Sequence, residues 1–238
     1  MSIETMNKPV CVIVGVGSGN GASFARKFAN EGYAVAMLSR NIEYLQQLAK
    51  EIPNSQAYQY DVTQVDSAAA IFKQIELEMG TISVLVYNAG AGAFNNIEDA
   101  DVESFQRAWE VNARGLFIAA KQVIPQMRQL NGGSIVIIGA TASIKGGANF
   151  TPFASAKAAQ RSLAQSMARY LDPEHIHVSY IIVDGVIDLE RTRKAMPNKP
   201  DDYFINPDDL AESVWFLTQQ PSSAWTFELD LRPFGEKW

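Results

Sequence analysis

The segment VCVIVGVGSGNG, residues 10–21, begins as a continuous apolar run and ends with glycines at alternate positions. A β-branched run of this kind is typical of a strand that is buried on both faces of a parallel sheet. Apolar side chains from Phe24 to Ala29 then recur at helical spacing, and Gly32 supplies a helix stop. The segment therefore predicts a strand, a glycine loop and a helix in direct succession.

Strands and helices continue to alternate along the rest of the chain. Apolar runs predict strands at residues 33–38, 57–60, 82–87, 134–138, 178–183 and 226–231. Helical periodicity predicts helices at residues 42–51, 65–79, 102–130, 150–171 and 207–218. This order indicates an α/β protein with a Rossmann-type, doubly wound parallel sheet flanked by helices, in one domain over residues 1–238. The segment 185–207, rich in charge and proline, is expected to be a mobile lid or substrate loop, with a plain connection as the alternative.

The composition excludes several classes of protein. Hydrophobic residues make up 47% of the 238 residues and charged residues 19%, which does not fit a disordered, collagenous or disulfide-rich chain. The 20 basic and 26 acidic side chains give a formal charge of −6, so we expect no nucleic-acid or membrane partner. The single cysteine, Cys11, needs no oxidising compartment, and Met1–Lys8 has no apolar core of a signal peptide. We therefore expect a cytoplasmic protein that acts on a small molecule.

The glycine loop has the chemistry of a phosphate-binding turn. Its spacing is G-x-x-x-G-x-G, whereas the G-x-G-x-x-G spacing fails because residue 20 is Asn. Glycines let the chain turn sharply and approach a pyrophosphate, whose charge the N–H groups at the helix start then bind. Dinucleotide binding is therefore favoured over a simple tight turn or the cofactor loop of a methyltransferase. The residues expected at the phosphates are Gly15, Ser18, Gly19, Asn20 and Gly21.

The end of the second predicted strand indicates the type of dinucleotide. Ser39 and Arg40 stand where an acidic side chain would accept the 2′-OH of an adenosine ribose. A hydroxyl and a guanidinium suit a 2′-phosphate instead, so NADP(H) is favoured over NAD(H), although a solvated arginine at a strand end is the simpler alternative. After the third strand, Asp61 precedes Val62 and is expected to accept a hydrogen bond from the adenine amino group or to act as a helix N-cap.

Four motifs in combination resemble one known family. They are the Gly15/Gly19/Gly21 loop, Asn88-Ala89-Gly90 after the strand at 82–87, Asn112 in the long helix, and Lys157. On these residues the chain resembles the short-chain dehydrogenase/reductase family, from about residue 10 to residue 183. The resemblance implies a Rossmann-type domain, NAD(P) binding, hydride transfer to or from a carbonyl or alcohol, and a homodimer or homotetramer packed through the two long helices. It also implies that Asn88-Ala89-Gly90, Gly185 and Ile187 lie at the cofactor.

The same resemblance reveals a departure at the catalytic positions. In the family, a Tyr four residues before the Lys transfers the substrate proton, and a Ser thirteen residues before that Tyr orients the carbonyl. Lys157 and Asn112 match the family, but Phe153 and Ala140 stand at the Tyr and Ser positions. A phenyl ring has no proton to transfer and a methyl group has no hydrogen bond to give. A milder departure is Leu189, where the family has a Thr near the nicotinamide amide.

Two functions remain open for a site altered in this way. If the chain is an enzyme, a displaced hydroxyl or a water supplies the proton, with Ser143 the first candidate and Thr141 the second, whereas Ser155 faces away on its helix. If the chain is a catalytically silent NADP(H)-binding regulator or scaffold, Lys157 is still needed, because in the family it also bonds the ribose. Neither function involves a metal. An S-adenosylmethionine enzyme is disfavoured, because the glycine loop has no acidic residue and Lys157 would be unexplained.

Overall fold

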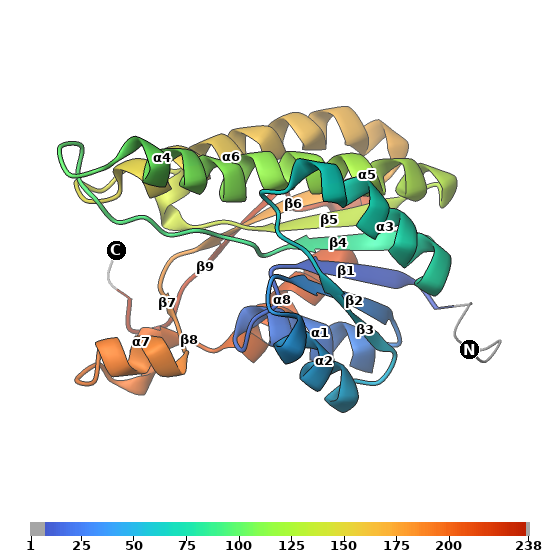
Figure 1. The fold of residues 1–238 in the computed structure, drawn as a ribbon, viewed down its shortest axis with the longest axis horizontal. Helices are drawn as coiled ribbons and strands as arrows, with labels where there is room; N and C mark the ends of the chain where they lie inside the picture. The colour runs from blue at the N-terminus through green and yellow to red at the C-terminus, as the bar shows by residue number, and fades with distance from the viewer. Residues whose placement is uncertain (1–7, 237–238) are drawn as a thin grey trace.

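The computed structural model describes residues 8–236, so the expectation for residues 1–7 lies outside the described part of the chain. The strands are β1 (Val10–Val14), β2 (Ala34–Ser39), β3 (Ser55–Gln59), β4 (Ile82–Tyr87), β5 (Gly133–Ile138), β6 (Ile176–Val183), β7 (Val186–Ile187), β8 (Phe204–Ile205) and β9 (Glu228–Leu231). The α-helices are α1 (Asn20–Asn30), α2 (Ile42–Glu51), α3 (Val65–Met79), α4 (Val102–Trp109), α5 (Gly115–Gln129), α6 (Thr151–Leu171), α7 (Glu190–Ala195) and α8 (Pro207–Thr218). These elements form a layered α/β structure (Figure 1).

The main sheet is parallel throughout, with strand order β3-β2-β1-β4-β5-β6-β9. The direction of winding reverses between β1 and β4, and ligands of open α/β sheets bind at the carboxyl ends of the strands at such a switch point. Val14, the last residue of β1, pairs with Leu38 in β2 and with Tyr87 in β4. This register brings the residues that follow the three strands to one edge of the sheet.

Helices cover both faces of the sheet, so both faces belong to the core (Figure 1). One layer contains α1, α2 and α8, with Phe24, Phe28 and Leu45 fully buried against the sheet. The opposite layer contains α3, α5 and α6, whose buried side chains include Phe72 and Leu116. Apolar burial on two faces is the main contribution to stability in such a fold.

The long helix predicted at 102–130 is interrupted by a π-helical turn, Glu110–Arg114, between α4 and α5. Tyr87 at the end of β4 donates its hydroxyl to the Val111 carbonyl oxygen in this turn, at 2.5 Å. Gly115 leaves room for the tyrosine, because a Cβ there would overlap the Tyr87 hydroxyl. Turns of this kind depart from the regular helical hydrogen-bond pattern and occur frequently at functional sites. Here the turn carries Asn112.

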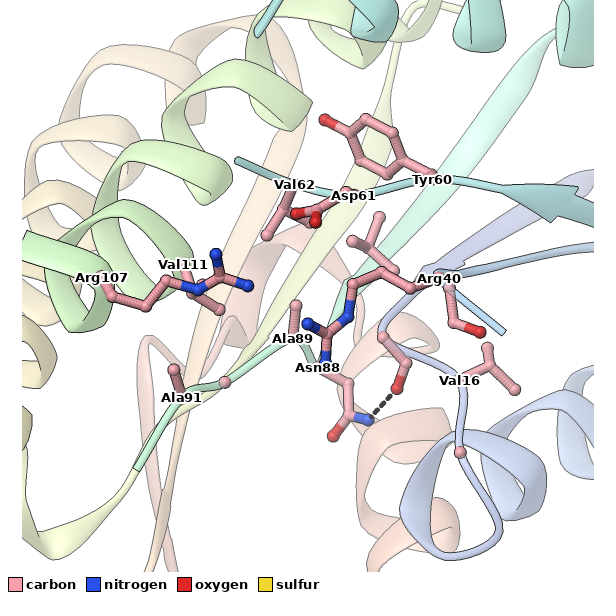
Figure 2. Close-up of a pocket in the computed structure, with 15 residues that line it drawn as sticks. Val16, Arg40, Tyr60, Asp61, Val62, Asn88, Ala89, Ala91, Arg107 and Val111 are labelled. Atoms are coloured by element: carbon pink, nitrogen blue, oxygen red, sulfur yellow. Dashed lines mark hydrogen bonds between the residues drawn. The ribbon is translucent and has the colours of Figure 1, made fainter. Parts of the chain in front are cut away.

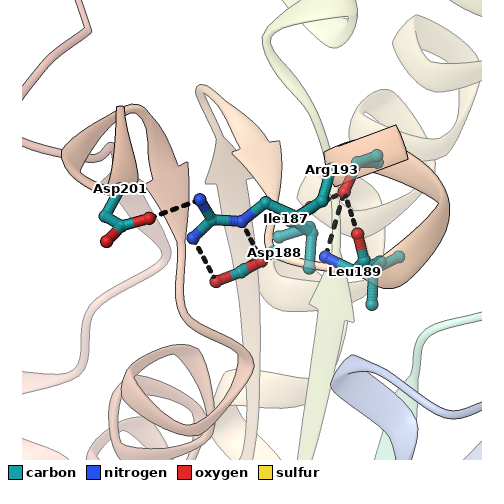
Figure 3. Close-up of polar contacts among 6 residues, drawn as sticks. Ile187, Asp188, Leu189, Arg193 and Asp201 are labelled. Atoms are coloured by element: carbon teal, nitrogen blue, oxygen red, sulfur yellow. Dashed lines mark hydrogen bonds and ion pairs between the residues drawn. The ribbon is translucent and has the colours of Figure 1, made fainter. Parts of the chain in front are cut away.

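Residues 185–207, which we call the flap, contain β7, α7 and β8 and are more ordered than a plain connection. Arg193 of α7 donates to both carboxylate oxygens of Asp188, at 2.7 and 2.8 Å, and to Asp201 at 2.5 Å (Figure 3). Its guanidinium also lies 4.1 Å from the centre of the Phe204 ring. The hydrogen bonds from Arg193 lower the pKa of Asp188. These contacts hold the flap together as one unit.

The predicted fold class is confirmed. Besides the π-turn and the elements of the flap, the differences lie at element boundaries. The third strand runs from Ser55 to Gln59 rather than over 57–60, the last begins at Glu228 rather than at 226, and β6 begins at Ile176 rather than at 178. The first two are strands at the edges of the sheet, where the hydrophobic pattern is weakest. No helix within residues 8–236 is long and apolar enough to cross a bilayer.

Candidate active site

The glycine loop brings the end of β1 close to the end of β4. Gly15 has φ +95°, and a Cβ on it would lie 2.5 Å from the Ala89 nitrogen. Side chains rarely adopt this conformation, so both the backbone and the space require glycine. Asn88 donates from Nδ2 to the Gly15 carbonyl oxygen at 2.7 Å, which ties the two strand ends together. The sharp turn predicted at Gly15 is present.

A cavity of about 400 Å³, which we call the switch-point cavity, opens where β1 and β4 end (Figure 2). Its wall comes from segments far apart in the sequence, and it includes the carboxyl ends of β1, β2 and β4. Eight residues predicted at the cofactor meet there, namely Gly15, Ser39, Arg40, Asp61, Val62, Asn88, Ala89 and Gly90. The structure therefore assembles most of the predicted dinucleotide-binding residues around one space.

Two guanidinium groups face the switch-point cavity, Arg40 after β2 and Arg107 from α4 (Figure 2). The hydroxyls of Ser39 and Tyr60 are buried and have no hydrogen-bond partner among residues 8–236. Burial without a partner costs about 1–3 kcal/mol per group, so the Ser39 hydroxyl at the strand end indicates a polar ligand, whereas the Tyr60 hydroxyl points away from the cavity (Figure 2). Arg107 and Tyr60 were not predicted, because nothing in their local sequence distinguishes them from surface or core residues.

Asp61 lies at the edge of the switch-point cavity and is held in place by Thr63. Its Oδ1 accepts hydrogen bonds from the Thr63 backbone nitrogen at 2.9 Å and from the hydroxyl at 2.8 Å. Burial raises the pKa of Asp61, but these bonds and the charges of Arg107 and Arg40 lower it overall, which keeps the carboxylate ionised. The N-cap of α3 is Gln64, so the expectation that Asp61 caps this helix is wrong. A role toward a ligand in the cavity stays open.

The remaining part of the glycine loop lies under the flap. Ser18 is exposed, Gly19 is the N-cap of α1, and Asn20 and Gly21 begin the helix. The Leu189 side chain rests on Gly19, because a Cβ on Gly19 would overlap Leu189 Cδ2. The flap therefore covers the N-terminus of α1, which is the end that presents free N–H groups.

Outside the glycine loop, three residues predicted at the cofactor do not line the switch-point cavity, namely Lys157, Gly185 and Ile187. Gly185 is packed against Pro233, where a Cβ would lie 2.6 Å from the proline ring. Ile187 belongs to β7, pairs with Ile205 of β8 and contacts the core on the α8 side of the sheet. The structure does not bring Gly185 or Ile187 to the switch-point cavity.

Asn112 is fully buried and links three segments around the site. Its Nδ2 donates to the Ala108 carbonyl oxygen at 2.8 Å and to the Ala91 carbonyl oxygen at 3.1 Å. Its own backbone carbonyl oxygen accepts from Gln160 Nε2 at 2.9 Å. The Oδ1 atom has no hydrogen-bond partner among the described residues. Asn112 thus joins the loop after β4 to helix α6 and keeps one acceptor free.

Lys157 places its ammonium group inside the protein, with the residue only 5% exposed. Its Nζ donates to the Ile138 carbonyl oxygen at 2.9 Å and to Gln160 Oε1 at 3.0 Å. The centre of the Phe153 ring lies 6.0 Å from Nζ. Burial lowers the pKa of Lys157 to about 7, because desolvation penalises the charged form. Gln160 connects Lys157 to Asn112, a link that the sequence did not predict.

The candidate hydroxyls differ in what they bond. Thr141 donates to Asp184 Oδ1 at 2.6 Å and is therefore already engaged. Ser143 is buried beside the Tyr180 hydroxyl. Burial raises the pKa of Tyr180 to about 12. The Ser143 hydroxyl has no hydrogen-bond partner among the described residues, so it keeps its donor for a ligand.

Phe153 belongs to an aromatic cluster at the surface of the site. Phe94 makes edge contacts with Phe150 and Phe153, at ring-centre distances of 5.3 and 5.4 Å. Phe94 is 62% exposed, so the cluster forms an apolar wall in contact with solvent. Ser155 is exposed on α6 and donates to the Thr151 carbonyl oxygen at 2.7 Å, as expected for a residue that faces away from the site. Within residues 8–236, no group of three His, Cys, Asp or Glu side chains could hold a metal ion.

Comparison with known proteins identifies the family. The family model described as short chain dehydrogenase matches residues 9–199. The chain belongs to the short-chain dehydrogenase family. The matched range contains the glycine loop, Asn112 and Lys157, and it ends inside the flap.

Similar proteins match over nearly the whole chain. An uncharacterized oxidoreductase of Staphylococcus saprophyticus is 28% identical over 239 residues, which cover 97% of this chain and 99% of the relative. The crystal structure of a short-chain dehydrogenase from Rhodopseudomonas palustris is 33% identical, with a TM-score of 0.82 over 95% of this chain and 99% of that one. An alcohol dehydrogenase from the archaeon Thermococcus sibiricus, complexed with 5-hydroxy-NADP, is 26% identical, with a TM-score of 0.87 over 96% and 98% of the two chains.

Proposed function

We propose that the chain is an NADP(H)-dependent oxidoreductase that transfers hydride between its cofactor and a small carbonyl or alcohol substrate. The observation that carries this proposal is the switch-point cavity, where Ser39 ends β2, Arg40 follows it and no acidic residue stands at that strand end. A guanidinium and a hydroxyl bind a 2′-phosphate through charge-assisted hydrogen bonds, whereas the carboxylate of an NAD site would repel it. The family supplies the class of reaction.

The residues around the cavity fit the parts of NADP(H). The unpartnered Ser39 hydroxyl and Arg40 suit the 2′-phosphate, and Asp61 with Val62 suits the adenine. The backbone of the glycine loop, residues 15–21, suits the pyrophosphate. Lys157 is assigned to the nicotinamide ribose, and Gly185 and Ile187 remain assigned to the nicotinamide end, which the flap would have to complete. The 5-hydroxy-NADP complex of the similar Thermococcus sibiricus enzyme supports this choice of cofactor.

Each side chain of the catalytic region has a role in the proposal. The bound cofactor supplies or accepts hydride. The Lys157 ammonium holds the ribose, and Gln160 fixes it relative to Asn112. Phe153, at the position of the family's tyrosine, shields the reacting carbon from water. Ser143, displaced from the position that Ala140 occupies, donates a hydrogen bond to the substrate oxygen.

A second function is a catalytically silent NADP(H)-binding regulator or scaffold. It is favoured by the apolar side chains of Phe153 and Ala140 and by the Leu189 side chain, which lies over the glycine loop. A silent binder needs the same cofactor contacts, so measuring cofactor binding alone does not distinguish the two functions. The two functions differ in whether the protein turns over a substrate.

The experiment that separates the two functions is a screen of aldehydes, ketones and alcohols at high enzyme concentration, in which consumption of NADPH or formation of NADPH from NADP⁺ is followed. The proposal expects consumption with at least one reactive carbonyl by the unmodified chain. The double variant Phe153→Tyr, Ala140→Ser is the matched comparison. Turnover that appears only in this variant contradicts the enzyme proposal and supports the silent binder.

We also propose a homodimer or homotetramer that acts in the cytoplasm. Exposed aromatic side chains on α4 and α5 support an interface on the long helices, since Phe105, Trp109 and Phe117 are each nearly half exposed. Light scattering tests this assembly, and the variant Phe117→Glu is expected to shift the mass toward the monomer.

A further inference from the structure

Lys157 differs from every other charged residue in the described part of the chain. Within residues 8–236, it is the only lysine, arginine or carboxylate that is buried. An ionised amine inside a protein is costly unless it is hydrogen-bonded or can lose its proton. A role in holding the cofactor ribose does not by itself require such deep burial. The burial of Nζ therefore points to a role beyond holding the ribose.

The hydrogen bonds of Lys157 leave room for one more acceptor. An ammonium group has three N–H donors. The structure gives Nζ two acceptors among the described residues, the Ile138 carbonyl oxygen and Gln160 Oε1. Gln160 is in turn fixed by its bond to the Asn112 carbonyl oxygen, so the amine is held in position from α6, from the end of β5 and from the π-turn. One N–H is left for a further acceptor.

The other candidate proton donors are poorly suited. Phe153 has no ionisable group, and Thr141 is bonded to Asp184. Tyr180 is fully buried, lies 3.4 Å from both the Lys157 carbonyl oxygen and Gln160 Oε1, and has a pKa raised to about 12. Ser143 can donate a hydrogen bond, but net proton transfer from a serine needs an adjacent base.

We infer that the one N–H of Lys157 without a protein acceptor bonds the ribose when the cofactor alone is bound and, when a carbonyl substrate enters, delivers its proton to the substrate oxygen instead, through the space that a phenolic hydroxyl on Phe153 would fill. The inference rests on the proposed function. As hydride reaches the carbonyl carbon, the C=O π bond opens and its electron pair moves to the oxygen. An Nζ–H bond of Lys157 breaks while the O–H bond forms. The alcohol and a neutral amine result, the reduced nicotinamide is the reductant, and a solvent proton restores the ammonium group.

The charges around Nζ are consistent with this role. The groups in contact with Nζ are Gln160 and the Phe153 ring from α6 and the Ile138 carbonyl from β5. Asn112 and the Tyr180 hydroxyl lie one step further away, where both contact Gln160. None of them carries a charge at neutral pH, so nothing offsets the cost of burying the ammonium, and burial lowers the pKa of Lys157 to about 7. A proton donor is most effective when its pKa lies near the working pH.

The first test does not depend on turnover. Lysine labelled with ¹³C at Cε reports the protonation of each side chain by NMR, and the Lys157 signal is assigned by its loss in Lys157→Arg. The inference predicts that this lysine titrates near pH 7 in the cofactor-free protein, far below the exposed lysines. The variant Gln160→Glu is expected to raise its midpoint by at least one pH unit, because a carboxylate favours the ammonium form. Titration of Lys157 above pH 9 overturns the inference.

The second test uses the reaction itself. Lys157→Ala is expected to lower kcat for carbonyl reduction by about 10²–10⁴-fold at saturating NADPH. Small primary amines in the buffer are expected to restore part of the rate in this variant, in proportion to their protonated fraction. Lys157→Arg keeps a positive charge beside the ribose, but a guanidinium cannot release its proton. This variant is therefore expected to bind NADPH and to lose turnover. Lys73→Ala removes an exposed lysine of α3 and is the matched control.

The outcomes distinguish this inference from the proposed function. For the native chain, kcat for reduction is expected to fall as the pH rises through the NMR midpoint of Lys157, because the proton donor is lost. If NADPH is consumed but kcat is independent of pH from 6 to 9, or if Tyr180→Phe abolishes turnover and amines fail to rescue Lys157→Ala, the inference is wrong and the proposed function stands. If no carbonyl or alcohol supports turnover, both are wrong.

Discussion

The switch-point cavity and the region around Lys157 lie on the same edge of the sheet, yet they are built differently. The cavity is open and carries two guanidinium groups and the unpartnered hydroxyl of Ser39. The region around Lys157 buries its ammonium group and has Phe153 and Ala140 where the family has polar groups. The comparison teaches that cofactor binding depends on backbone geometry and a few fixed charges. Proton transfer needs only one group that titrates near neutral pH, so the role of proton donor can pass from the family's tyrosine to another side chain.

The largest effect is expected from Gly15→Ala, which changes the backbone where the ends of β1 and β4 meet. The left-handed φ and the overlap of the new Cβ with the Ala89 backbone should lower the free energy of unfolding by about 3 kcal/mol or more. Thermal or urea unfolding measures the loss. Gly17→Ala is the control, because a Cβ on Gly17 meets no atom within 4 Å and its stability should be unchanged. Equal stability of both variants would contradict the role given to Gly15.

Arg40→Ala should separate the two nicotinamide cofactors. A hydrogen bond to a charged group contributes about 1.5–3 kcal/mol, so the Kd for NADPH should rise about 10- to 100-fold while the Kd for NADH barely changes. Fluorescence titration with both cofactors measures the two constants. Arg26→Ala, on the exposed ion pair with Glu51, is the control and should leave both constants unchanged. An equal loss for NADPH and NADH would place Arg40 away from the 2′-phosphate.

Asp61→Ala should have a smaller effect with the opposite preference. Loss of one hydrogen bond to the adenine, about 1 kcal/mol, should weaken NADH binding about fivefold. NADPH should lose less, because removal of the carboxylate leaves Arg40 and Arg107 free to attract the 2′-phosphate. Calorimetric titration gives both affinities, and Asp66→Ala on the exposed start of α3 serves as the control. Stronger weakening of NADPH than of NADH would argue against this arrangement.

The smallest effect is expected from Leu189→Ala, which tests whether the flap hinders access to the glycine loop. Since Leu189 rests on Gly19, its removal should favour the open form, and the apparent Kd for NADPH should fall about two- to threefold. Stopped-flow binding should show the change in the association rate. Leu77→Ala removes an exposed leucine of α3 and should change neither quantity. Slower association in Leu189→Ala would mean that the side chain assists binding.

The fold and the cofactor half of the site could be predicted because their signals are local in the sequence. The glycine loop, Ser39 and Arg40, and Asn88-Ala89-Gly90 each follow a strand directly, and parallel strands bring their carboxyl ends to one edge. The π-turn at Asn112 could not be predicted, because it depends on the contact between Tyr87 and the Val111 carbonyl.

The surroundings of Lys157 could not be predicted, because they arise from tertiary contacts. Gln160 and Tyr180 look like ordinary helix and strand residues, and only the folded chain brings them to Lys157. The lowered pKa of Lys157 is a consequence of burial, which no local motif encodes. Arg107 could not be predicted either, because only the folded chain brings α4 to the cavity.

The central claim is that the switch-point cavity binds NADP(H) through its 2′-phosphate. The most direct test is a fluorescence titration of the native chain with NADPH and with NADH under identical conditions. The account predicts that NADPH binds at least about tenfold more tightly, equivalent to one charge-assisted contact of about 1.4 kcal/mol. Equal affinities, or no binding of either cofactor, would contradict it.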